Sequence, residues 1–153
     1  MKLQFRHQAF QADAAKAVCD VFAGQPFRTP TYMIDSGLGQ IPLSRVDDFT
    51  GFSNAPIVVS DDKILEHIRA IQRASGIKPS DALDGRYNLT IEMETGVGKT
   101  YTYIKTMYEL NKRYGWSKFI IVVPSVAIRE GVYKSFQMTE EHFSEDYGKK
   151  IRY

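Results

Sequence analysis

Residues 93–100 read Met-Glu-Thr-Gly-Val-Gly-Lys-Thr, and this stretch decides how the sequence is interpreted. Its ending matches the G-K-[ST] signature of the phosphate-binding P-loop. Gly96 and Gly98 allow a tight turn whose backbone N–H groups approach phosphate oxygens, because no Cβ blocks the way. Lys99 offers a positive charge to the β- and γ-phosphates of ATP, and Thr100 offers a hydroxyl to Mg²⁺. We therefore predict a nucleotide-binding loop, with Lys99 and Thr100 as its catalytic residues.

The loop departs from the general P-loop pattern at its first position, where Met93 replaces the usual glycine. The match is therefore to a variant of the motif, and the alternative interpretation is a glycine-rich turn with a surface lysine. The residues expected to contact ATP are Glu94, Thr95, Gly96, Val97, Gly98, Lys99 and Thr100.

The segments around the loop follow a strand–helix–strand–helix pattern. Residues 89–93 alternate between apolar and polar, which predicts a short strand, and residues 99–113 predict a helix. Residues 118–123 are apolar on both faces, as in a buried parallel strand. Ser125 is expected to cap a further helix that runs to Phe136. The pattern predicts the α/β class, with a parallel sheet flanked by helices. Only two strands are readable, which leaves the sheet incomplete.

The first half of the chain gives weaker signals. Residues 11–22 predict a helix that ends before Gly24 and Pro26. Residues 25–87 are interpreted as an insert of uncertain structure to which no chemistry is assigned, because prolines and glycines recur in its first part. Within this insert, Ser60 is expected to cap a second helix.

Composition limits the class of protein. The 153 residues suit one domain, and 43% apolar with 25% charged residues is ordinary for a globular protein. The net charge of +2 neither reveals nor excludes a nucleic-acid partner. The longest apolar run, residues 119–123, is too short to cross a membrane, and the N-terminus lacks the apolar stretch of a signal peptide. A cytosolic protein without a membrane partner is expected.

Metal-binding and redox chemistry have little support in the sequence. The single cysteine, Cys19, excludes a disulfide within the chain and a cysteine-rich zinc site, and it is expected to be a buried side chain on a helix. The three histidines, His7, His67 and His142, lie far apart with no ligand spacing. The only metal predicted is the Mg²⁺ at Thr100.

Two stretches carry a resemblance to a known family. Residues 93–100 resemble motif I of superfamily 2 helicases, and FIIVVPSVAIREGV, residues 119–132, looks like the following strand and motif Ia. Residues 88–147 are similar to the Res subunit of type III restriction-modification enzymes, and so is the opening FQADAAKAV, residues 10–18. The resemblance implies that residues 1–153 are the N-terminal part of a RecA-like helicase ATP-binding domain.

The same resemblance implies a function. The whole protein is expected to be a cytoplasmic, ATP- and Mg²⁺-dependent DNA translocase or helicase of a restriction system, with an endonuclease elsewhere in its sequence. Double-stranded DNA and the modification (methyltransferase) subunit are the expected partners.

The resemblance also assigns a role to Gln11, which stands where these helicases place an adenine-reading glutamine. An amide both donates and accepts hydrogen bonds, so it can pair with the N6 and N7 edge of adenine. The alternative is a solvated glutamine at a helix start, and Gln8 is a rival for the same role. Phe5 or Phe10 is expected either to stack on the base or to belong to the core.

Ser125 and Arg129 fall at the motif Ia position, which in helicases touches the DNA backbone. A hydroxyl, helix N-terminal N–H groups and an arginine can grip a phosphate. The alternative is that Ser125 only caps its helix and that Arg129 is solvated.

ATP hydrolysis in this superfamily also needs an Asp-Glu pair at the end of a strand, and no apolar run here ends in one. The acidic stretch 140–146 is interpreted as a solvated helix face. The chain alone is therefore expected to bind ATP without hydrolysing it and without cleaving DNA. Two alternatives remain open, a small P-loop kinase and a non-catalytic nucleotide-binding module.

Overall fold

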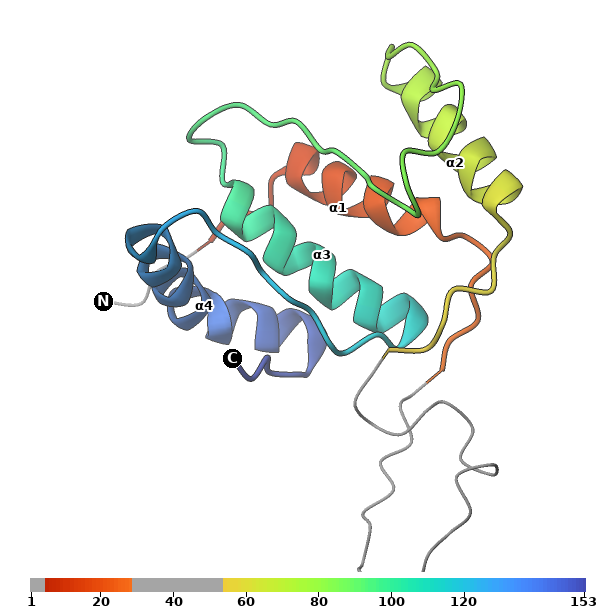
Figure 1. Cartoon of the computed structure of the whole chain (residues 1–153). Helices are drawn as coiled ribbons and strands as arrows, with labels where there is room; N and C mark the ends of the chain where they lie inside the picture. The colour runs from red at the N-terminus through yellow and green to blue at the C-terminus, as the bar shows by residue number, and fades with distance from the viewer. Residues whose placement is uncertain (1–4, 29–53) are drawn as a thin grey trace, which may run out of the picture.

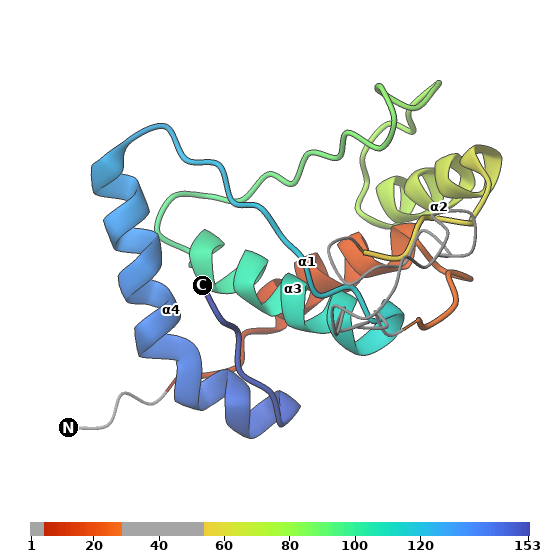
Figure 2. The same cartoon turned by 60° about the horizontal axis from the view of Figure 1, so that its bottom comes forward.

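The computed structural model describes residues 5–28 and 54–153. The described residues form four α-helices: α1 (Ala9–Val21), α2 (Asp61–Ala74), α3 (Lys99–Tyr114) and α4 (Val126–Tyr147). Helix α3 packs against both α1 and α4, and α2 contacts α1 (Figures 1 and 2). None of the helices in these two ranges is long and apolar enough to cross a membrane.

The predicted α/β fold with a parallel sheet is wrong for the described residues, which contain no β-strand. The two segments predicted as strands, 89–93 and 118–123, are irregular, and Figure 2 shows both on the same side of α3. Ile120 is 92% exposed and Val122 is 88% exposed, the opposite of a buried parallel strand. A strand forms through backbone hydrogen bonds to a neighbouring strand, and no described segment supplies that neighbour.

The helix predictions are confirmed, with shifts at their ends. The helix predicted over 11–22 is α1, and the one predicted over 99–113 is α3. Helix α4 begins directly after Ser125, whose Oγ accepts a hydrogen bond from the Ile128 N–H at 3.3 Å. This is the predicted cap, although α4 continues past Phe136 to Tyr147.

The second predicted cap is only half right. Ser60 takes the N-cap position of α2, but its side chain makes no capping hydrogen bond. Its backbone carbonyl accepts the first helical bond, from the Ile64 N–H at 3.0 Å. Of the insert predicted over residues 25–87, residues 29–53 lie outside the described residues.

Helix α4 is longer than predicted because its acidic part also carries a core residue. Phe143 is fully buried within the stretch 140–146, so the interpretation of that stretch as a solvated face is wrong at this position. The ring of Phe143 lies 5.1 Å from that of Tyr108 and 4.9 Å from that of Tyr101. The buried apolar cluster between α3 and α4 consists of Ile104, Met107, Tyr108, Phe136 and Phe143.

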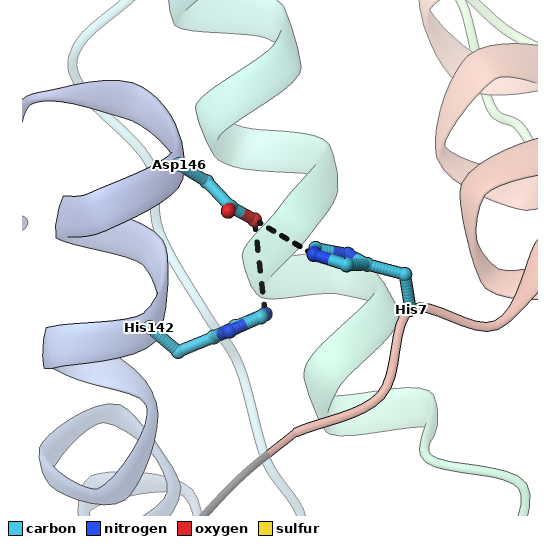
Figure 3. A group of neighbouring side chains, drawn as sticks. All are labelled: His7, His142 and Asp146. Carbon is cyan, nitrogen blue, oxygen red and sulfur yellow. Dashed lines mark ion pairs between the residues drawn. The ribbon is translucent and has the colours of Figure 1, made fainter.

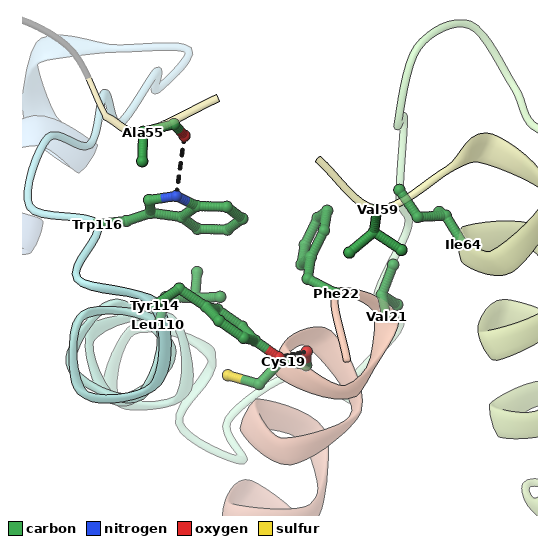
Figure 4. Close-up of a cluster of buried hydrophobic side chains, with 9 residues drawn as sticks. All are labelled: Cys19, Val21, Phe22, Ala55, Val59, Ile64, Leu110, Tyr114 and Trp116. Carbon is green, nitrogen blue, oxygen red and sulfur yellow. Dashed lines mark hydrogen bonds between the residues drawn. The ribbon is translucent and has the colours of Figure 1, made fainter. Parts of the chain in front are cut away.

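A second buried cluster joins α1, α2, the end of α3 and the segment before α2 (Figure 4). Trp116 Nε1 donates a hydrogen bond to the Ala55 carbonyl at 3.1 Å, and the Tyr114 hydroxyl donates to the Cys19 carbonyl at 2.7 Å. These bonds satisfy the polar atoms of two core aromatic residues. The cluster consists of Cys19, Val21, Phe22, Ala55, Val59, Ile64, Leu110, Tyr114 and Trp116.

Cys19 is fully buried on α1, as predicted. Burial raises the pKa of its thiol to about 12, which keeps the sulfur protonated and chemically inert at neutral pH.

Asp20 joins α1 to α3 through an ion pair. Its Oδ1 accepts a hydrogen bond from Arg113 Nη1 at 2.7 Å, and Lys16 pairs with its Oδ2. Burial alone would raise the pKa of Asp20, but hydrogen bonds from Lys16 and Arg113 outweigh it and hold the pKa below its ordinary value of 3.8. The folded state is therefore stabilised above the unfolded pKa, and this stabilisation is lost as the pH falls through the folded pKa.

We expect Asp20→Asn to destabilise the chain by about 1 kcal/mol or less at pH 7, because the ion pair is partly exposed. The difference from wild type should shrink below about pH 3.9, the ordinary pKa of an unfolded aspartate, and vanish below the folded pKa. Urea unfolding between pH 3 and 7 measures this. Asp13→Asn, which removes an exposed carboxylate from the same helix, is the matched control. A loss of equal size at pH 3 and pH 7 would contradict the electrostatic explanation.

Candidate nucleotide-binding loop

The loop ahead of α3 is built on two glycines in the left-handed region. Gly96 has φ +84° and Gly98, the N-cap of α3, has φ +89°. Residues with a Cβ rarely adopt a positive φ, so glycine is favoured at both positions. Helix α3 starts at Lys99, and the N–H groups of its first turn have no partner within the helix. These donors and the positive end of the helix dipole favour an anion at this place.

Gln11 of α1 contacts the loop through a hydrogen bond to its backbone. Its Nε2 donates a hydrogen bond to the Val97 carbonyl at 2.9 Å, across 86 residues of sequence. A Cβ placed on Gly98 would lie 2.6 Å from the same nitrogen, so the amide packs closely on the loop. Gln11 is 8% exposed, and its interpretation as a solvated glutamine is therefore wrong.

The predicted phosphate and magnesium ligands lie where a ligand in solution can reach them. Lys99 is exposed, and Thr100 is half-buried in the first turn of α3. Glu94, Thr95 and Gly96 are also exposed, while Val97 and Gly98 are half-buried. The loop therefore presents its charged side chain and most of its backbone to solvent.

A cavity of about 500 Å³ lies between α1, α3 and the two extended segments. Most of its lining is apolar, including Ile91, Met93 and Phe119, and Lys99 reaches its wall. A triphosphate needs polar partners for its charges. The cavity is therefore no candidate for the nucleotide, and the backbone of the loop is the better one.

The rivals for base recognition are arranged differently. Gln8 is exposed at the N-cap of α1 and makes no side-chain capping bond. Phe10 is 47% exposed, so its assignment to the core is wrong and its ring is available for stacking. The ring of Phe5 already lies 6.1 Å from Tyr101 and 5.4 Å from His142.

Ser125 and Arg129 stand together at the start of α4. Ser125 uses its hydroxyl as the helix cap, and Arg129 is exposed and pairs with Glu130 at 3.1 Å. Both contacts agree with the structural alternative, and a role at the DNA backbone stays a prediction.

One group of side chains was not foreseen from the sequence. The side chains of His7, His142 and Asp146 point toward one another (Figure 3), although the histidines are 135 positions apart in the sequence. The spacing of His142 and Asp146, four residues apart on a helix, was the one available signal, and nothing local pointed to His7.

Comparison with known proteins identifies the same family as the motifs. The family described as "Type III restriction enzyme, res subunit" matches residues 58–152, which include the loop and the start of α4. The chain is 38% identical over 104 residues to the Res subunit of the type III restriction-modification enzyme EcoP15I from Escherichia coli. It is 37% identical over 103 residues to the EcoPI Res subunit of Escherichia phage P1.

Each of these two matches covers 65% of the chain and 11% of the relative. A third relative, the StyLTI Res subunit of Salmonella typhimurium strain LT2, is 46% identical over 66 residues, covering 42% of the chain and 7% of the relative. The similarity thus spans about a tenth of the relatives' length or less. Because the family match covers more than half of the chain, this protein belongs to the family of type III restriction enzyme Res subunits.

Proposed function

We propose that this chain is the ATP-binding front portion of an ATP-dependent DNA translocase or helicase subunit of a type III restriction endonuclease. Residues 1–153 would form the N-terminal part of its helicase ATP-binding region, with residues 25–87 as an insert. The observation that carries the proposal is the pair of left-handed glycines, Gly96 and Gly98, leading into the N-terminus of α3.

The donors around the loop fit the phosphates of ATP and a magnesium ion. Backbone N–H groups at the start of α3 and the Lys99 ammonium would bind the β- and γ-phosphates. Mg²⁺ prefers oxygen ligands, and the Thr100 hydroxyl is such a ligand beside the loop. When bound, Mg²⁺ would neutralise phosphate charge.

Gln11 has enough hydrogen-bonding groups to contact the loop and adenine at the same time. A glutamine amide has two N–H donors and an oxygen with two lone pairs. One donor is used on Val97, which leaves the second donor for adenine N7 and the oxygen for the adenine N6 amino group. Through these bonds Gln11 would connect recognition of adenine to the position of the loop.

We expect Gln11→Ala to weaken ATP binding about tenfold and to reduce the preference for ATP over GTP, since each lost hydrogen bond costs about 1 kcal/mol. Competition of ATP and GTP against a fluorescent ATP analogue measures both effects. Gln8→Ala is the matched control and should behave like wild type. A preference that survives Gln11→Ala but disappears in Gln8→Ala would move the role to Gln8.

The remaining partners follow from the family and are proposals for this chain. We infer double-stranded DNA, contacted in part by Ser125 and Arg129, and the modification subunit of the restriction complex as partners in the cytoplasm.

The first test of the proposed function is saturable binding of a fluorescent ATP analogue, with Mg²⁺, to the 153-residue chain and to its Lys99→Ala variant. Saturable binding that requires Lys99 supports the proposal, and its absence from the wild type contradicts it.

A further inference from the structure

We propose that His7, His142 and Asp146 form a binding site for a transition-metal ion of the Zn²⁺ type, separate from the nucleotide loop. The Nε2 atom of His7 lies 3.6 Å from Asp146 Oδ2, and the Nε2 atom of His142 lies 3.8 Å from the same oxygen (Figure 3). The ligand atoms of the three residues all lie within 4.8 Å of one another.

These separations are close to those of a tetrahedral site. Zinc binds nitrogen and oxygen at about 2.0–2.2 Å, so two ligand atoms at tetrahedral angles are about 3.3–3.6 Å apart. Small side-chain rotations would bring the three donors onto one ion. His142 and Asp146 are four residues apart on α4, so the helix fixes their relative position.

His142 is already oriented by its neighbours. Its ring lies 5.1 Å from Phe143, 5.6 Å from Tyr101 and 5.4 Å from Phe5, and its side chain is 14% exposed. The side chains of His7 and Asp146 are 60% and 29% exposed. One ligand is thus held by the core while the other two face solvent, so an ion can enter and water can complete its coordination.

The chemistry of the donors selects the kind of metal. Two imidazoles and one carboxylate suit Zn²⁺, Co²⁺, Ni²⁺ or Fe²⁺, whereas Mg²⁺ and Ca²⁺ favour sets of oxygens. The ion at this site would therefore differ from the Mg²⁺ proposed at the loop. It would tie the segment before α1, four residues ahead of Gln11, to the far part of α4.

The hydroxyl of Tyr101 competes for one of the proposed ligands. It lies 2.7 Å from His142 Nε2, the atom that would bind the metal. Tyr101→Phe removes the hydroxyl and keeps the ring, so this variant should hold Zn²⁺ at least as tightly as wild type. Loss of binding in Tyr101→Phe would instead make the hydroxyl the ligand and overturn the proposed set.

The decisive experiment titrates Zn²⁺ into the tag-free, metal-depleted chain in competition with a chromophoric chelator. We expect one ion per chain, and visible absorption from Co²⁺ in the same site. His7→Ala and Asp146→Asn should each lower the affinity about tenfold or more, since even loss of an outer-shell partner costs about that much. His7 is exposed, so its removal should leave the helices intact, which circular dichroism checks.

His67→Gln is the matched control, because His67 Nδ1 lies 3.0 Å from the Val21 carbonyl, away from the proposed ligands. This variant should bind Zn²⁺ like wild type. Failure of the wild type to bind Zn²⁺ in a one-to-one ratio, or wild-type affinity in both His7→Ala and Asp146→Asn, would overturn the proposal.

Discussion

Lys99→Ala should lower the affinity of the chain for ATP by roughly 10- to 100-fold, because a charge-assisted hydrogen bond to phosphate contributes about 1.5–3 kcal/mol. The ammonium group is exposed at the first residue of α3, so its removal leaves no buried group unsatisfied. Alanine is also a good helix former, and the fold should persist. Titration with a fluorescent ATP analogue in the presence of Mg²⁺ measures the change.

Two further variants test whether the effect is specific to the Lys99 charge and whether Thr100 binds the magnesium ion. Lys112→Ala removes an exposed lysine near the other end of α3 and should bind ATP like wild type. Thr100→Ala should lose the Mg²⁺ dependence of binding more than the affinity for free nucleotide, since its hydroxyl is the proposed metal ligand. Equal ATP affinity in wild type and Lys99→Ala would reject the loop as the nucleotide site.

Phe143→Ala should destabilise the fold by about 3–5 kcal/mol, the usual cost of removing a buried aromatic ring. The side chain is fully buried and packs on Tyr101 and Tyr108, so its loss opens a cavity between α3 and α4. The cost is a large part of the total stability of a small domain, which is about 5–15 kcal/mol. Urea unfolding followed by circular dichroism measures the shift.

Phe10→Ala is the matched control for this substitution. It removes the same ring from α1, where the side chain is 47% exposed, and should change the stability by about 0.5 kcal/mol or less. A loss in Phe143→Ala as small as the one expected for Phe10→Ala would mean that the interface between α3 and α4 contributes little to folding.

The helices could be predicted because their signals are local. Gly24 and Pro26 marked the end of α1, and Ser125 marked the start of α4, and the structure places both ends within a residue or two of the prediction. The end of α4 could not be predicted in the same way. Phe143 stands in an acidic stretch, and only its packing against rings on α3 shows that this stretch belongs to the core.

The sheet was predicted wrongly because the apolar pattern of one segment carries no information about the strand that it would pair with. Residues 118–123 have the composition of a buried strand, yet Ile120 and Val122 are almost fully exposed. Hydrogen bonding between strands depends on segments distant in the sequence, so the pattern of one segment cannot supply it.

In the candidate site, too, the local features could be predicted and the contacts between distant residues could not. The loop could be found from consecutive residues, since each contributes through its own backbone or side chain. The contact between Gln11 and Val97 depends on how α1 packs against α3, and only the family resemblance suggested that Gln11 belongs near the nucleotide. The meeting of His7 with Asp146 had no such resemblance to suggest it.

The apolar run at residues 119–123, of which 119–122 are exposed, also affects how the purified protein will behave in solution. It is uncharged and rich in β-branched residues, the composition that favours cross-β association between identical chains. Lys118 and Pro124 border it, and charge and proline are the residues that oppose such association. Dilute samples kept cold and examined soon after purification will therefore favour the monomer, and titrations at low micromolar protein will be easier to interpret than concentrated ones.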